Sequence, residues 1–162
     1  MKLYFLRHGI AFERSTWEQD DTRRPLTEEG IEKMKHIAGV LAESQLEIEL
    51  ILTSPLVRAK QTAEIVAEKL NVQLLEDARL APGFDLKKLG SILLDHPNVE
   101  TLMVVGHEPD FSNTISALIG GGQIVCKKGG LALVEFSKES LKGELLALVP
   151  PRLLLHGGRN GS

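Results

Sequence analysis

Short apolar runs alternate with helix-like patterns along most of the chain. The first run, residues 2–6, is bulky and partly aromatic and stops at Arg7-His8-Gly9, which is typical of a buried strand that enters a glycine turn. Similar runs predict strands at 50–53, 72–75 and 101–105, and two later ones, at 131–136 and 144–149, are candidates for an antiparallel pair at one edge. Between the runs, apolar residues at helical spacing predict helices over 28–41, 55–70, 86–94 and about 110–119.

The residue types at two helix starts support these boundaries. Thr27 is a suitable N-cap, and it is followed by Glu28 and Glu29, which favour the first turn of a helix because its N-terminus carries a partial positive charge. Ser54-Pro55 offers a second N-cap, with proline in the first helical position.

Strands that alternate with helices at this spacing indicate βαβ units. The predicted fold class is therefore α/β, a three-layer α/β/α sandwich with a mostly parallel sheet. The polar stretch 10–25 is too long for a simple connector, and we interpret it as a lid or a mobile loop. The glycines at 120–122 follow a helix instead of opening one and are interpreted as a turn. In such sheets ligands bind beyond the carboxyl ends of the strands, so the residues that follow strands are the first candidates for function.

Composition narrows the class of protein. With 162 residues, 43% of them hydrophobic, the chain is predicted to form one domain, 1–162, with a frayed tail at about 157–162. Nineteen Lys and Arg against 22 Asp and Glu give a net charge of −3, which argues against nucleic acid or an anionic membrane surface as a partner. No apolar stretch is long enough for a signal peptide or a membrane span. The lone cysteine, Cys126, is interpreted as an inert thiol, and a reducing compartment, the cytoplasm, is expected.

Charged and imidazole side chains follow three of the predicted strands. Arg7 and His8 follow the first strand, Ser54 and, one helical turn later, Arg58 follow the second, and His107 follows the fourth. Arginine forks match phosphate oxygens, and the helix dipole near Arg58 favours the same anion. A histidine in such a pocket can attack phosphorus with one ring nitrogen when a hydrogen bond to the other nitrogen fixes the tautomer. The sequence therefore predicts a pocket for a phosphate dianion.

In order and spacing, these segments resemble the histidine phosphatase superfamily, also called phosphoglycerate mutase-like. The resemblance rests on Leu6-Arg7-His8-Gly9, on the stretch from Ser54 to Thr62 that contains Arg58, and on Gly106-His107-Glu108-Pro109. The segment 24–30, Arg-Pro-Leu-Thr-Glu-Glu-Gly, together with the short length, is similar to the SixA branch, the small protein phosphohistidine phosphatases. The motifs cover residues 3–109, and the later strands resemble that branch more loosely.

The resemblance implies a role for each matching residue. His8 would be the nucleophile and become transiently phosphorylated, and Gly9 would let the backbone turn away and expose it. Arg7, Arg58 and His107 would bind the transferring phosphoryl group and stabilise the charge on its oxygens. Water would then hydrolyse the phosphohistidine. No metal or cofactor is implied, and the other histidines, which lack ligand spacing, are interpreted as surface or structural residues: His36, His96 and His156.

One element of the wider family is missing. Members that act on phosphate monoesters carry a glutamate general acid in a Glu-x-x-Tyr-Gly type segment, and residues 75–85 contain no such motif. The general acid is therefore unknown, and the candidates by position are Glu76, Asp77, Asp85, Glu13, Asp20 and Asp21. An alkoxide leaving group needs a proton from the enzyme, whereas the imidazole of phosphohistidine can be protonated on its own free nitrogen near neutrality. The departure favours hydrolysis of a P–N bond.

The chain is too short to build a deep pocket around a small metabolite, so an open site for a phosphorylated protein side chain is expected. In the SixA branch the partner is a histidine-containing phosphotransfer domain or a similar phosphocarrier protein, for which Phe12, Trp17 and Phe84 are candidate docking residues. Two alternatives stay open: a small-molecule phosphomonoesterase of the same superfamily, and a non-enzymatic phosphoprotein-binding module. The module is disfavoured because His8 would be useless for binding alone. The sequence indicates no oligomeric state.

Overall fold

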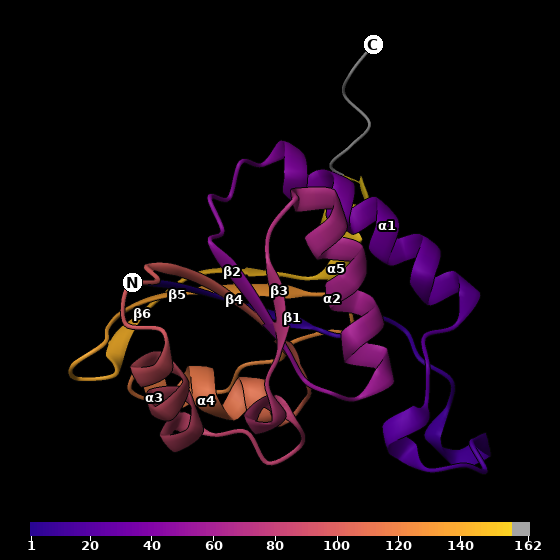
Figure 1. Cartoon of the computed structure of the whole chain (residues 1–162), viewed down its shortest axis with the longest axis horizontal. Helices are drawn as coiled ribbons and strands as arrows, with labels where there is room; N and C mark the ends of the chain where they lie inside the picture. The colour runs from indigo at the N-terminus through magenta and orange to yellow at the C-terminus, as the bar shows by residue number, and fades with distance from the viewer. Residues whose placement is uncertain (157–162) are drawn as a thin grey trace.

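A six-stranded sheet runs through the centre of the protein (Figure 1). The computed structural model describes residues 1–156, so the predicted frayed tail, 157–162, lies outside the described residues. Four strands are parallel, and β5 and β6 continue the sheet as an antiparallel pair, in the order β3-β2-β4-β1-β5-β6. Their bounds are β1 (Lys2–Arg7), β2 (Leu50–Thr53), β3 (Leu74–Glu76), β4 (Thr101–Gly106), β5 (Leu131–Ser137) and β6 (Lys142–Val149).

Helices cover both faces of this sheet. One face packs against α1 (Glu28–Glu43), α2 (Val57–Leu70) and α5 (Pro151–His156), and the other against α3 (Leu86–Asp95) and α4 (Asp110–Leu118). The predicted α/β/α sandwich with a mostly parallel sheet is confirmed. Within residues 1–156, no helix is long and apolar enough to cross a membrane.

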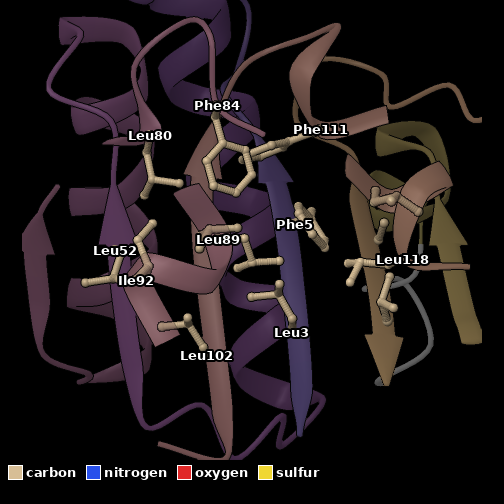
Figure 2. Packing of buried hydrophobic residues seen from close by; sticks show 14 of the residues in the cluster. Leu3, Phe5, Leu52, Leu80, Phe84, Leu89, Ile92, Leu102, Phe111 and Leu118 are labelled. Atoms are coloured by element: carbon tan, nitrogen blue, oxygen red, sulfur yellow. The ribbon is translucent and has the colours of Figure 1, made fainter. Parts of the chain in front are cut away.

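The core follows from the alternation of side chains along the central strands. In β1, Leu3 and Phe5 point to the α3 and α4 layer, while Tyr4 and Leu6 point to the α1 and α2 layer. Figure 2 shows the first of these clusters, in which Phe111 of α4 lies edge-on to Phe5, with ring centroids 5.2 Å apart. Both faces of β1 are therefore fully buried, as its uninterrupted apolar run predicts.

Phe84 belongs to the same cluster, and the interpretation of this residue as a docking residue is wrong. Only 3% of Phe84 is exposed, and its ring centroid lies 5.9 Å from that of Phe111 (Figure 2). The backbone N–H of Phe84 donates to a carboxylate oxygen of Asp110 at 3.2 Å, as does that of Gly83 at 2.7 Å. The α4 N-terminus thus holds the loop that precedes α3 over the core.

The two predicted helix starts have different outcomes. Thr27 caps α1, since its hydroxyl accepts a hydrogen bond from the backbone N–H of Gly30 at 3.0 Å. The cap predicted at Ser54-Pro55 is wrong, because Leu56 is extended and α2 begins at Val57. The Ser54 hydroxyl accepts from the Leu56 backbone N–H at 3.3 Å and is also engaged by a histidine described below.

The polar stretch 10–25 has a definite conformation. An antiparallel bridge between Ala11 and Leu26 closes its base, and two short 3₁₀ helices, η1 (Arg14–Thr16) and η2 (Asp21–Arg23), form its body. The predicted turn at 120–122 is confirmed, with φ angles of 84°, 122° and 112° that glycine adopts without a steric penalty. The helix α5 was not predicted, and β3 begins and ends later than the predicted 72–75.

Candidate active site

The predicted site residues meet at one edge of the sheet. Strands β2, β4 and β1 are neighbours and parallel, so their carboxyl ends lie side by side. The backbone N–H of His8 donates to the Gly106 carbonyl at 3.1 Å, and that of Ser54 donates to the Val105 carbonyl at 3.0 Å. These bonds extend the ladder past the strands and bring the loops into contact. The rings of His8 and His107 are 5.4 Å apart between centroids.

The hydrogen bond of the His8 ring fixes its tautomer. The Nδ1 atom lies 2.8 Å from the carbonyl oxygen of Gly9, which can only accept, so Nδ1 carries the proton and donates it. The Nε2 atom therefore keeps its lone pair. His8 is 5% exposed, and burial, followed by the neighbouring His107, Arg58 and Arg7, outweighs the Gly9 hydrogen bond and lowers the pKa of the ring to about 3. The His8 imidazole is therefore neutral at physiological pH, with a free lone pair on Nε2.

Gly9 is required for a reason other than the predicted turn. Its φ lies outside the left-handed range, so the backbone does not need glycine for its conformation. A Cβ at this position would lie 2.7 Å from Cγ of Met34 in α1. The absence of a side chain lets α1 approach the loop, and the Gly9 N–H donates to the Thr62 hydroxyl of α2 at 3.0 Å. Gly9 thus connects the loop that carries His8 to both helices.

His107 is also buried and neutral. It is 4% exposed, and burial, together with the nearby charges of Arg58 and Arg7, lowers its pKa to about 4. Its Nε2 lies 2.7 Å from the Ser54 hydroxyl oxygen. Its Nδ1 is buried and has no hydrogen-bond partner among residues 1–156. When the Ser54 hydroxyl donates to Nε2, the free Nδ1–H is available as a donor.

The two arginines share one pattern of contacts. Arg7 donates from Nη1 to the Cys126 carbonyl at 2.9 Å, and Arg58 donates from Nη1 and Nη2 to the backbone and side chain of Asp21 at 2.9 and 3.1 Å. The Nε atoms of both are buried without a partner in the described part of the chain. Burial lowers the pKa of both guanidiniums, whose ordinary value is so high that they stay charged. Arg58 is the second residue of α2, so the helix N-terminus adds to the positive potential.

Buried polar groups are normally hydrogen-bonded, so the unpartnered donors of Arg7, Arg58 and His107 need an acceptor. All three residues lie near the His8 imidazole, whose Nε2 lone pair is free. A tetrahedral oxyanion supplies acceptors in several directions at once, and a phosphoryl group fits both the charge and the donor set.

Comparison with known proteins gives an independent result. Residues 3–82 match the family model described as "Histidine phosphatase superfamily (branch 1)". The chain is 34% identical over 168 residues to an uncharacterised protein of Picosynechococcus sp., with 96% of this chain and 99% of that one covered. It is 30% identical over 125 residues to the phosphohistidine phosphatase SixA of Escherichia coli, with 75% and 76% covered. The chain belongs to the histidine phosphatase superfamily. It is a SixA-type protein and a phosphatase.

Solved structures agree with this assignment. The structure of the protein histidine phosphatase SixA complexed with tungstate matches this histidine phosphatase with a TM-score of 0.84 and 28% identity, and the match covers 95% of this chain and 99% of that one. The fold is therefore that of phosphoglycerate mutase-like proteins, as the sequence predicts.

Five of the six carboxylates considered as general acids of this histidine phosphatase bind residues outside the site, cap helices or face solvent. Asp77 binds Arg79, Glu76 binds Lys60, and Asp85 and Asp20 cap α3 and η2, while Glu13 is exposed. Among residues 1–156, Asp21 is the one of these six with a hydrogen bond to a site side chain. Burial raises the pKa of Asp21, but the hydrogen bond from Arg24 and the charge of Arg58 outweigh it and lower the pKa. An ionised carboxylate does not serve as an acid.

Three contacts of this histidine phosphatase's site were not predicted. Ser54 binds His107, Thr62 binds the Gly9 backbone, and Asp21 binds Arg58. Ser54 and Thr62 lie in the sequence motif around Arg58, which indicates that this region belongs to the site but does not predict these contacts.

Within residues 1–156, no group of three or more His, Cys, Asp or Glu side chains could hold a metal ion. His36 and His156 are exposed and His96 is half-buried, in agreement with their interpretation as surface or structural residues.

Proposed function

We propose that this phosphatase hydrolyses phosphohistidine on a phosphotransfer or phosphocarrier protein through a covalent phospho-His8 intermediate. The observation that carries the proposal is the neutral, buried His8 with a free Nε2, surrounded by unpartnered donors of Arg7, Arg58 and His107. A binding module needs the donors but not the oriented lone pair.

In the first step the Nε2 lone pair of His8 attacks phosphorus, and the P–N bond of the substrate breaks. The electron pair of that bond leaves with the substrate imidazole, which is neutral after departure because its other nitrogen was protonated beforehand. The Gly9 carbonyl holds the Nδ1–H of His8 and stabilises the positive charge that develops on the ring. No proton from an enzymic acid is needed.

In the second step water attacks phosphorus of phospho-His8, the P–N bond breaks, and Nε2 regains its lone pair as inorganic phosphate forms. Arg7, Arg58 and the Nδ1–H of His107 bind the equatorial oxygens in both steps, where charge spreads in the transition state. These donors stabilise the negative charge on the phosphoryl oxygens, so we propose that the reaction needs no metal cofactor.

The positions of the acidic residues support a P–N substrate. Asp21, the candidate acid that contacts the site, is an ion-paired carboxylate with a lowered pKa. Hydrolysis of an alkyl phosphate would lack its proton donor, whereas phosphohistidine brings one. A small-molecule phosphomonoesterase is therefore the weaker candidate.

The surroundings of the site support a protein partner. Phe12 is 46% exposed and packs against Trp17, with ring centroids 5.9 Å apart, on the same segment that carries Asp21 to Arg58. Phe12 is exposed and Trp17 is half-buried, and an aromatic pair of this kind on the segment that contacts Arg58 is suited to contact another protein. The net charge of −3 gives no reason to expect nucleic acid or a membrane. We place the enzyme in the cytoplasm, because its cysteine is free and buried.

A turnover comparison tests the proposal. The purified protein, in EDTA, is offered a phosphohistidine-bearing phosphotransfer domain, free phosphohistidine, p-nitrophenyl phosphate and 3-phosphoglycerate. We expect the phosphorylated domain to have the highest kcat/KM. If 3-phosphoglycerate is best, a carboxylate of this chain is a general acid and the enzyme is a metabolite phosphatase, because an alkoxide leaving group needs a proton. If the aryl ester is best, the preference for phosphohistidine is contradicted, but no general acid is implied, because p-nitrophenolate leaves without a proton. The Phe12→Ala variant separates docking from chemistry: KM should rise for the phosphorylated domain and stay constant for free phosphohistidine.

A further inference from the structure

Asp21 bridges two arginines at the edge of the phosphoryl pocket. Its Oδ2 accepts from Nη2 of Arg58 at 3.1 Å, and its Oδ1 accepts from Nε of Arg24 at 2.9 Å. Its backbone carbonyl also accepts from Nη1 of Arg58 at 2.9 Å. Arg24 is itself buried and donates from Nη1 to the Phe12 carbonyl. Asp21 thus binds both terminal nitrogens of Arg58 while Arg24 holds its carboxylate from the other side.

The free edge of Arg58 is the one that a phosphoryl group needs. A guanidinium presents its donors in a planar fork, and the edge formed by Nε and one terminal nitrogen binds two oxygens together. Asp21 takes one hydrogen from each terminal nitrogen and leaves the Nε–H unpartnered and buried. Arg7 has the same arrangement, since its Nη1 is held by the Cys126 carbonyl and its Nε is unpartnered.

Charge leads to the same conclusion. The Arg58 side chain is 6% exposed, so it has lost most of its hydration, and Asp21 is the carboxylate paired with it. An unpaired buried guanidinium is costly and would turn toward solvent or another acceptor. The side chain of Asp21 is 32% exposed, so it is less costly to hold charged at the pocket's edge.

We propose that Asp21 is a positioning residue for phosphoryl transfer, which orients Arg58 so that its Nε edge faces the phosphoryl group. The proposal rests on the proposed function, in which Arg58 binds that group. Asp21 acts only through Arg58 and does not itself touch the substrate. Through Asp21 alone, the polar stretch 10–25 contributes to the site, because Asp21 contacts an arginine that lies 37 residues further along the chain.

The test compares Asp21→Asn with a matched control in the same stretch. Asp21→Asn removes the charge and one acceptor oxygen, and Glu18→Gln removes the same charge from an exposed residue. The Kd for tungstate, a phosphate mimic, and kcat/KM for free phosphohistidine are measured for both variants, with Tm as the measure of folding. We expect Asp21→Asn to weaken tungstate binding and lower kcat/KM by roughly tenfold or more, and Glu18→Gln to change neither.

A double-mutant cycle with Arg58→Ala tests whether the effect passes through Arg58. In the Arg58→Ala background, Asp21→Asn should change the tungstate Kd by less than about twofold, because the positioned group is gone. Tighter tungstate binding by Asp21→Asn in the wild-type background would show that the carboxylate competes with phosphate and would overturn the proposal. A lowered Tm with an unchanged Kd, or an equal loss in both backgrounds, would also overturn it.

Tungstate binding requires no turnover, so failure of the proposed function is recognised separately. If the wild-type protein binds tungstate but leaves phosphohistidine intact, the proposed function fails while the Kd comparison still decides the role of Asp21. If the wild-type protein hydrolyses phosphohistidine but does not bind tungstate, kcat/KM of the variants decides the role of Asp21. If it does neither, both proposals are overturned.

Discussion

The two buried imidazoles should make the protein less stable at mildly acidic pH. The pKa of His8 is about 3 and that of His107 about 4 in the folded protein, against 6.5 in the unfolded chain. Below pH 6.5 the unfolded chain therefore binds protons that the folded protein does not, so stability falls as the pH falls. The loss begins near the unfolded value and grows until the folded values are reached.

The magnitude follows from the pKa difference. One pKa unit corresponds to about 1.4 kcal/mol, so at about pH 5 each histidine favours unfolding by roughly 2 kcal/mol relative to neutral pH. Both residues are buried, with exposed fractions of 5% and 4%, so solvent screening does little to reduce this value. The two together cost roughly 4 kcal/mol, which corresponds to a drop in Tm on the order of 10 °C for a chain of this size.

The assay is urea unfolding, followed by circular dichroism, at about pH 7 and about pH 5, where carboxylates contribute little because they titrate lower. The variants His8→Asn and His107→Asn each remove one of the two titrating rings and keep the other, so each should lose about half of the pH effect. Comparing each protein with itself at two pH values removes any loss of packing caused by the substitution. A pH dependence equal to that of the wild type in both variants would refute the description of His8 and His107 as neutral, desolvated rings.

Further substitutions test other parts of the site and fold. Arg58→Ala should lower kcat/KM on the order of 100- to 1,000-fold, with a smaller effect on stability in urea unfolding. In the proposed mechanism the lost Nε donor stabilises the transition state. A loss in stability with unchanged kcat/KM would contradict this. In α1, Gly30→Ala should destabilise the protein by about 2 kcal/mol or more, because its Cβ would lie 2.0 Å from the Ile10 carbonyl oxygen. Gly39→Ala in the same helix, with nothing within 4 Å of its Cβ, should stabilise the protein by about 0.5–1 kcal/mol. Urea unfolding measures both variants, and equal effects would show that the contact at Gly30 is unimportant. Burial raises the pKa of Cys126 to about 11, so iodoacetamide at about pH 8 should leave the thiol unmodified and the activity intact; rapid inactivation would contradict this.

The fold could be predicted because its sheet is buried on both faces. Each central strand then appears as a short apolar run between amphipathic stretches, and β2 has the predicted bounds, 50–53. The short strand β3 and the helix α5 lie at the margins of the fold, where burial leaves a weaker pattern. Phe84 could not be distinguished from a surface aromatic, because the partner that buries it, Phe111, lies on another element.

The sequence predicts that the candidate site residues meet at one edge of the sheet, but it does not predict their contacts. His8, Arg58 and His107 follow strands whose ends a parallel sheet must bring together. Their hydrogen-bond partners lie far along the chain, as in the pairs of His107 with Ser54 and of Arg58 with Asp21, and no local pattern specifies them. The long-range contact also explains the error at Ser54, because its hydroxyl binds His107 and a cap is not formed.

Trapping the phosphorylated protein tests the central claim most directly. The enzyme is mixed with phosphohistidine for a short time and quenched in base, which preserves phosphohistidine, and the modified residue is located by peptide mass spectrometry. The mechanism predicts phosphate on His8, appearing and decaying at rates that support turnover, and no phosphoprotein in the His8→Ala variant. Phosphate on His107, or turnover by the His8→Ala variant, would contradict the mechanism.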